Sequence, residues 1–167
     1  MNRLAFALIV VFTGLLVSCS LLGGKLKPGD KIGDMQILDF CEGKVLYELC
    51  NDDQFTEGTC EIPASVTNLW ISPGWTEDTQ EQINAAWEGS KWEATIDERK
   101  IDLPAFGTYD FDKGDRKART WNVCLSNLTA GEHVLSVHFY LENSIERGNH
   151  YMTLPFTVLA ADPAKKP

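Results

Sequence analysis

Four of the five cysteines in this 167-residue chain have the number and spacing to form two disulfide bonds. They are Cys41, Cys50, Cys60 and Cys124; the fifth, Cys19, follows an apolar N-terminal run and is treated with it below. Zinc binding is the alternative, but these spacings lack the close Cys-x-x-Cys pairs that zinc sites usually show. An even set of cysteines in an exported chain favours disulfides. The sequence leaves three connectivities open, of which we choose Cys41–Cys50 as the local pair and Cys60–Cys124 as the long-range one.

Three aspartates form a second candidate site. Asp110, Asp112 and Asp115 resemble the alternating carboxylates with which EF-hand loops bind calcium. Lys113 comes too early for such a loop, and Trp121 stands where its glutamate is required. We therefore favour an acidic turn between strands and keep a weak calcium site as the alternative; no other cofactor is expected.

The five tryptophans are the third candidate, since exposed indole rings stack against sugars or anchor protein partners. Trp75 lies beside a Pro-Gly pair and is the best exposed candidate, with Trp87 as the second residue of a candidate ligand site. Packing in the core is the favoured interpretation for Trp121, and also for Trp87 and Trp92.

No sequence motif for a catalytic nucleophile, a zinc protease or a phosphate-binding loop is present. His133 and His138 differ in parity along one expected strand, so their side chains point to opposite faces. For His138, we favour a surface or partly buried position over a ligand role. We therefore predict that the protein is not an enzyme.

The N-terminus has the layout of a secretory signal, with Arg3 before an apolar run over residues 4–17. A transmembrane anchor is the alternative, but fourteen residues make roughly 21 Å of helix, short of the ~30 Å hydrocarbon core. The sequence Leu16-Val17-Ser18-Cys19 resembles the lipobox of bacterial lipoproteins. This resemblance implies a diacylglyceryl thioether on Cys19, with acyl chains such as palmitate. Because Ser20 is not Asp, it also implies the outer membrane in a diderm organism, or the outer face of the cell membrane in a monoderm one.

Cleavage before Cys19 would leave a strongly acidic chain, because losing Arg3 takes the formal charge from −9 to −10. Such a surface repels nucleic acid, so the expected partners are the membrane, through the lipid, and an unknown protein or glycan. The remaining length suits one domain. We expect a signal peptide over 1–18, Cys19 with a flexible tether over 19–30, a β-sandwich domain over 31–159 and a disordered tail over 160–167.

Apolar residues alternate with polar ones through most of the chain, which predicts strands. The clearest cases begin at Trp92, Trp121, Leu135 and Leu154. Earlier, we expect strands over 35–40 and 66–72, a turn over 72–74, and a disulfide-held loop over 41–60 that carries one strand over 45–49. One short helix over 77–87, with Thr76 as its cap, interrupts the strands.

Residues 128–137, Leu-Thr-Ala-Gly-Glu-His-Val-Leu-Ser-Val, resemble the corner that enters the sixth strand of bacterial immunoglobulin-like and fibronectin-III-like domains. His133 occupies the position where that corner usually carries Tyr. The resemblance implies an all-β, antiparallel immunoglobulin-like sandwich of about seven strands. This fold hosts many unrelated activities, so it predicts no function by itself.

The favoured function is a membrane-anchored, exported binding or adaptor lipoprotein without catalytic activity. A carbohydrate-binding module that uses exposed tryptophans is the first alternative, and an envelope hydrolase or another enzyme is the second.

Overall fold

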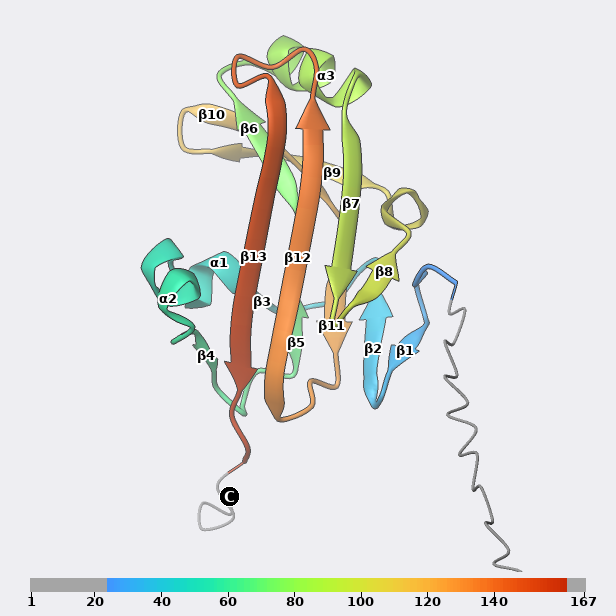
Figure 1. The fold of residues 1–167 in the computed structure, drawn as a ribbon, viewed down its shortest axis with the longest axis vertical. Helices are drawn as coiled ribbons and strands as arrows, with labels where there is room; N and C mark the ends of the chain where they lie inside the picture. The colour runs from blue at the N-terminus through green and yellow to red at the C-terminus, as the bar shows by residue number, and fades with distance from the viewer. Residues whose placement is uncertain (1–23, 162–167) are drawn as a thin grey trace, which may run out of the picture.

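The chain forms two packed β layers, seen in a computed structural model that describes residues 24–161 (Figure 1). The front layer is one five-stranded sheet in the order β4-β13-β12-β7-β8. Its strands are β4 (Glu61–Ile62), β7 (Lys91–Ile96), β8 (Arg99–Ile101), β12 (Gly131–Leu141) and β13 (Gly148–Val158). All neighbours are antiparallel except β4 and β13, which run parallel.

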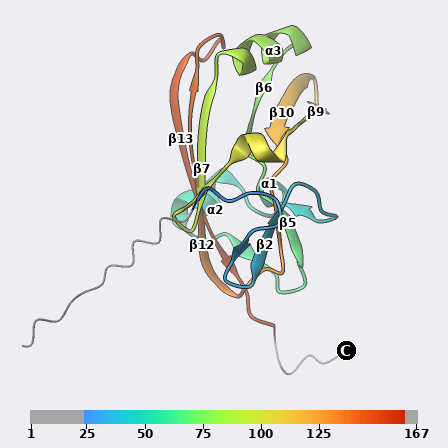
Figure 2. The same ribbon diagram turned by 90° about the vertical axis from the view of Figure 1, so that its right-hand side faces the viewer.

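The rear layer consists of two sheets that follow one another along the same pair of chain segments (Figure 2). The lower sheet has the order β1-β2-β11-β5-β3, and the upper sheet has the order β6-β10-β9. The lower strands are β1 (Lys31–Ile32), β2 (Met35–Leu38), β3 (Lys44–Val45), β5 (Asn68–Trp70) and β11 (Cys124–Ser126). The upper strands are β6 (Gly74–Glu77), β9 (Thr108–Lys113) and β10 (Arg116–Trp121).

Residues 72–74 do not form the turn that the sequence predicts. The chain runs on from β5 into β6, opposite the segment that joins β10 to β11. Ile71 N donates to Val123 O at 3.0 Å, and Trp121 N donates to Pro73 O at 2.9 Å. Pro73 has no backbone N–H, so the ladder is interrupted here without a change of direction.

Apolar and polar residues alternate along β12, which gives the front sheet one buried face and one outer face. Leu135, Val137, Phe139 and Leu141 are buried on its inner face, while polar residues between them lie on the outer face. β7 and β8 are joined by Asp97 and Glu98, which have positive φ angles of 48° and 65°. Two such residues form the tight hairpin turn whose twist matches the strands. The described residues are therefore mostly β, which agrees with the predicted all-β class; the pairing is mainly antiparallel, with β4–β13 and β3–β5 running parallel.

The first described residues are not a free tether. Leu26 is completely buried and pairs with Ile101 of β8 in an isolated parallel bridge. Leu26 N donates to Lys100 O at 2.7 Å, and Asp102 N donates to Leu26 O at 2.9 Å. The packed domain thus begins near Leu26 instead of Lys31, because one apolar side chain between two lysines reaches the core.

The cysteine-rich segment contains two short helices where we expected a strand over 45–49. They are α1 (Leu46–Leu49) and α2 (Asp52–Glu57). Asn51 accepts a bond from Gln54 N, and the Gln54 side chain accepts one from Asn51 N. This reciprocal cap satisfies two free N–H groups at the start of α2 and outweighs the turn-forming composition.

The four cysteines are all paired, as predicted, but the chosen connectivity is wrong. The bonds are Cys41–Cys124 and Cys50–Cys60. Cys124 lies opposite Leu38 in the β2–β11 ladder, so Cys41, just beyond β2, is its neighbour. Cys50 and Cys60 flank α2, which brings them together as a local pair.

The third helix begins later than expected. It is α3 (Gln80–Glu88), capped by Thr79 with a reciprocal bond to Gln82. Thr76 lies in β6, where it pairs with Ala118, so it cannot be the cap. A short 3-10 helix, η1 (Leu103–Phe106), follows β8.

None of the helices in residues 24–161 is long and apolar enough to cross a membrane. The predicted signal peptide and Cys19, together with most of the predicted C-terminal tail, lie outside the described residues.

Candidate functional site

A row of aromatic rings fills the upper end of the sandwich. Phe139 of β12 has Trp92 as its cross-strand neighbour in β7 and His150 as its neighbour in β13. The three rings are stacked, with centroids 4.3 Å apart for Trp92–Phe139 and 4.9 Å for Phe139–His150. Three adjacent strands thus present one continuous aromatic surface to the interior.

Indole rings from the opposite layer and from α3 close over this surface. Trp75 of β6 lies 5.6 Å from Phe139 and 5.1 Å from His150. At the other end of the row, Trp87 of α3 lies 5.0 Å from Trp92 and 5.3 Å from Trp121. These tilted and stacked geometries are the favourable arrangements for aromatic pairs, so the cluster also stabilises the upper end.

The row ends in a pocket that is lined in part by three indole rings. The pocket has a volume of about 280 Å³ and is lined by Trp87, Ser90, Trp92, Leu103, Pro104 and Trp121. We call it the indole pocket. The three indoles are half-buried, so each has one covered side and one accessible part. A flat ring with an apolar face fits such walls.

Hydrogen bonds fix the geometry of the indole pocket. Ser90 Oγ accepts a bond from Trp92 Nε1 and donates one to Trp87 O, both at 2.8 Å. Within the described residues, Trp121 Nε1 is the buried side-chain polar atom that has no partner. An unsatisfied buried N–H typically costs about 1–3 kcal/mol.

The side chain of Arg119 packs over the ring of Trp87. The Arg119 guanidinium lies 5.7 Å from the Trp87 ring centroid, within cation–π range. Asp110 holds Arg119 through two bonds of 2.6 and 2.7 Å, and Asn84 of α3 accepts a third at 2.9 Å. Hydrogen bonding to Arg119 lowers the pKa of Asp110, and the same bond raises the pKa of Arg119.

The predicted pair Trp75 and Trp87 does not form one site. Trp75 is half-buried at the far end of the row, and its Nε1 donates to Glu77 Oε1 at 3.0 Å. Trp87 does line a pocket, together with Trp92 and Trp121, which we had assigned to the core. Spacing along the chain could not reveal this group, because α3, β7 and β10 meet only in the folded protein.

The three aspartates of the calcium hypothesis have other partners or positions. Asp110 bonds Arg119 and Gln80, Asp112 pairs with Lys117, and Asp115 lies in the turn between β9 and β10. Among residues 24–161, no group of three His, Cys, Asp or Glu side chains is placed to hold a metal ion. The structure therefore gives the calcium hypothesis no support.

The histidines are held in separate places. His133 is buried, and its nitrogens lie 2.8 Å from Asp97 Oδ2 and 2.9 Å from Thr129 O. His138 lies on the outer face of the front sheet, stacked on Tyr151 at 4.3 Å. His150 Nε2 contacts Glu146 O at 2.8 Å. His133 and His138 do lie on opposite faces, as parity predicts.

A second hollow, of about 510 Å³, lies on the outer face of the front sheet. It is lined by Lys91, Glu93, His138, Tyr140, Glu142 and Asn149. His138 and Tyr140 contribute half-buried rings to its walls, but its other four lining residues are charged or amide side chains, and it has no tryptophan. The indole pocket is therefore the better candidate for a specific ligand.

Comparisons with known proteins supply no function for this chain, so the candidate site rests on the geometry described above. No protein-family model matches this chain, and no curated protein and no solved structure matches it.

Proposed function

We propose that this protein is an exported, lipid-anchored binding module without catalytic activity of its own. The two disulfides fit folding in an oxidising, extracytoplasmic compartment. The lipobox resemblance supports attachment through Cys19. Intact-mass measurement of the chain purified from membranes tests the anchor, since a diacylglyceryl group on Cys19 adds a defined mass.

The indole pocket is the proposed binding site, and a sugar ring is its proposed ligand. The single observation that carries this proposal is the set of three half-buried indole walls around about 280 Å³. The C–H face of a sugar packs on an indole face, while its hydroxyl groups remain in water or bond to polar groups at the rim. Ser90 Oγ supplies a polar atom at these walls; its proton is donated to Trp87 O, so it would act toward a ligand as an acceptor.

A glycan panel with matched variants tests this proposal. We expect the protein to bind at least one cell-wall or plant oligosaccharide, and Trp87→Ala to weaken that binding at least tenfold. Trp70→Ala is the control, because Trp70 lies in β5, beside Phe40, away from the pocket. A flat response across the panel, or equal losses in both variants, would reject the sugar site.

A protein partner is the second candidate, supported by the free edge of the upper rear sheet. All residues of β9 are exposed, and Tyr109 and Phe111 stack on each other with centroids 5.9 Å apart. An exposed edge strand can accept a strand from a partner. Replacing both rings by Ser should abolish binding to such a partner while leaving glycan binding intact.

We also propose that the sandwich is immunoglobulin-like. The front order β4-β13-β12-β7-β8 corresponds to strands A′, G, F, C and C′ of such a domain, and β5/β6, β10/β11 and β9 correspond to B, E and D. The contact from His133 Nε2 to Thr129 O has the form of the tyrosine corner, whose Tyr hydroxyl bonds to the backbone a few residues upstream. An experimental structure with a different strand order would reject this assignment.

A further inference from the structure

The burial of Leu26 places one edge of the sandwich close to the proposed lipid. Leu26 is the seventh residue after Cys19, and a chain spans at most about 3.6 Å per residue. Leu26 therefore lies within roughly 25 Å of the Cys19 backbone. Because Leu26 pairs with β8, this limit applies to the β8 edge of the domain and not to its other faces.

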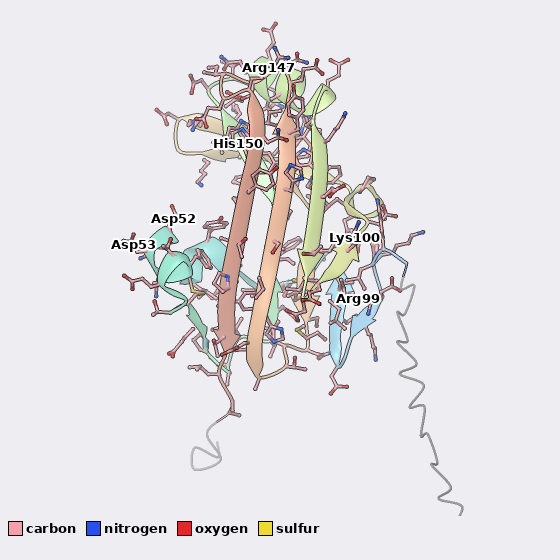
Figure 3. The ribbon with its side chains drawn as sticks, viewed as in Figure 1. Asp52, Asp53, Arg99, Lys100, Arg147 and His150 are labelled. Carbon is pink, nitrogen blue, oxygen red and sulfur yellow. A yellow bond between two sulfur atoms is a disulfide. The ribbon has the colours of Figure 1, made fainter. Side chains whose placement is uncertain are left out.

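The same edge carries several exposed basic side chains. We call the exposed residues Lys25, Lys27, Lys31, Arg99 and Lys100 the basic edge. Within residues 24–161, none of these five side chains makes an ion pair. Figure 3 shows Arg99 and Lys100 on the side of the molecule where the described chain begins.

Acidic residues are also present beside the basic edge. They are Asp30, Asp34, Glu98 and Asp102. Asp30 is partly engaged, because its Oδ2 accepts a bond from Lys27 N at 2.8 Å. The edge is thus mixed, with one more positive than negative group, in a protein whose formal charge is −9.

The opposite edge is strongly acidic. Asp52, Asp53 and Glu57 lie in α2, beside β4, and Asp52 and Asp53 stand on the far side from Arg99 and Lys100 in Figure 3. β4 and β8 are the two outermost strands of the five-stranded front sheet. With neighbouring strands about 4.8 Å apart, the two edges are separated by roughly 19 Å, about two Debye lengths at physiological salt.

We propose that the basic edge is a membrane-facing surface that lies against anionic phospholipid headgroups. The tether limits how far this edge can move away, and the charge asymmetry turns it toward an anionic leaflet while the acidic α2 edge points outward. Each basic residue near such a surface typically strengthens attraction about fivefold. This inference rests on the proposed lipid anchor, which holds the edge within reach.

Lysine acylation of the lipidated chain in nanodiscs tests the orientation. Discs of phosphatidylcholine alone are compared with discs that contain 30% phosphatidylglycerol. We expect Lys27, Lys31 and Lys100 to react at least threefold more slowly in the anionic discs, and the difference to disappear at high salt. Lys44 of β3 and Lys113 of β9 serve as references on other parts of the molecule and should react equally in both discs.

Two charge-reversal variants separate this effect from net charge. Lys27→Glu/Lys31→Glu/Lys100→Glu should remove the protection of Lys25, whereas Lys44→Glu/Lys91→Glu/Lys113→Glu, with the same change in net charge, should retain the protection of the basic edge. Equal rates in the two kinds of disc, or equal protection of Lys44 and Lys113, would overturn the proposal. Failure of the anchor is detected separately, because a chain without the lipid mass would dissociate from both kinds of disc.

Discussion

The two ends of the rear layer are stabilised by different means. The lower end, with β1, β2, β3, β5, β11, α1 and α2, contains both disulfides, and the residues it buries are mainly aliphatic. The upper end, with β6, β9, β10 and α3, contains no disulfide within the described residues, and aromatic stacking joins it to the front sheet. Covalent bonds secure one end, and ring contacts secure the other.

This difference follows from the length of the elements. The strands and helices between residues 39 and 67 are short, and each buries few side chains. The disulfides therefore supply stability that longer strands would gain from backbone hydrogen bonds and packing. The upper end has longer paired strands, and large rings fill its interior. Because half-buried rings can also contact a ligand, the upper end combines packing with a candidate binding surface.

Removing Cys41–Cys124 should have the largest effect on stability. The bond closes a loop with a sequence separation of 83, against 10 for Cys50–Cys60. The chain-entropy relation gives losses of about 4.5 and 2.7 kcal/mol, respectively. Denaturant unfolding of the two double Cys→Ser variants measures both values. Equal losses, or a larger loss from the short loop, would contradict this account of the lower end.

Phe139→Ala should have the next largest effect, because it removes the ring between Trp92 and His150 at the upper end. A buried Phe→Ala change costs about 3–5 kcal/mol. Near-ultraviolet circular dichroism should also lose intensity while both disulfides stay intact. A loss below about 1 kcal/mol would show that the aromatic row does not hold the upper end together.

Glu77→Ala should cost about 2 kcal/mol. The Glu77 carboxylate is 2% exposed and accepts bonds from Trp75 Nε1 at 3.0 Å and Ser144 Oγ at 2.6 Å. Its removal leaves a buried indole N–H without a partner. Ser144→Ala is the matched control and should cost about half as much in thermal or denaturant unfolding. The reverse order would mean that Glu77 does not support Trp75.

Asp110→Asn should have the smallest effect, about 0.5–1 kcal/mol, because the pair with Arg119 is partly exposed. Arg119 lowers the folded-state pKa of Asp110 below the ordinary value of 3.8. The contribution is therefore present above that value and is lost as pH falls through the lowered pKa. Unfolding at pH 7, 5 and 3 should show a constant difference from the original protein at pH 7 and 5, and a smaller one at pH 3. A difference that grows on acidification would contradict the sign.

The long strands were predictable because their burial alternates. β12 and β13 follow the alternation of their apolar residues. The helix α3 was found, but its start was misplaced because Glu77 and Asp78 resemble a helical first turn. Glu77 instead belongs to β6, where burial and two hydrogen bonds decide its place.

Disulfide connectivity and the indole pocket depend on contacts between distant segments. Cys124 lies next to Cys41 because β11 pairs with β2, a choice that local spacing does not determine. Trp87 and Trp121 meet because α3 packs against β10, and Trp92 joins them from the other layer. The sequence identified the tryptophans as candidate ligand-binding residues, but it could not show which of them line the same pocket.

The most direct test of the proposed binding site follows the indole N–H signals of all five tryptophans by nuclear magnetic resonance during titration with the oligosaccharide that binds best. We predict chemical-shift changes for Trp87, Trp92 and Trp121, with Trp70 and Trp75 unchanged. Changes confined to Trp70 or Trp75, or no change with any glycan that binds, would contradict the assignment of the indole pocket as the binding site.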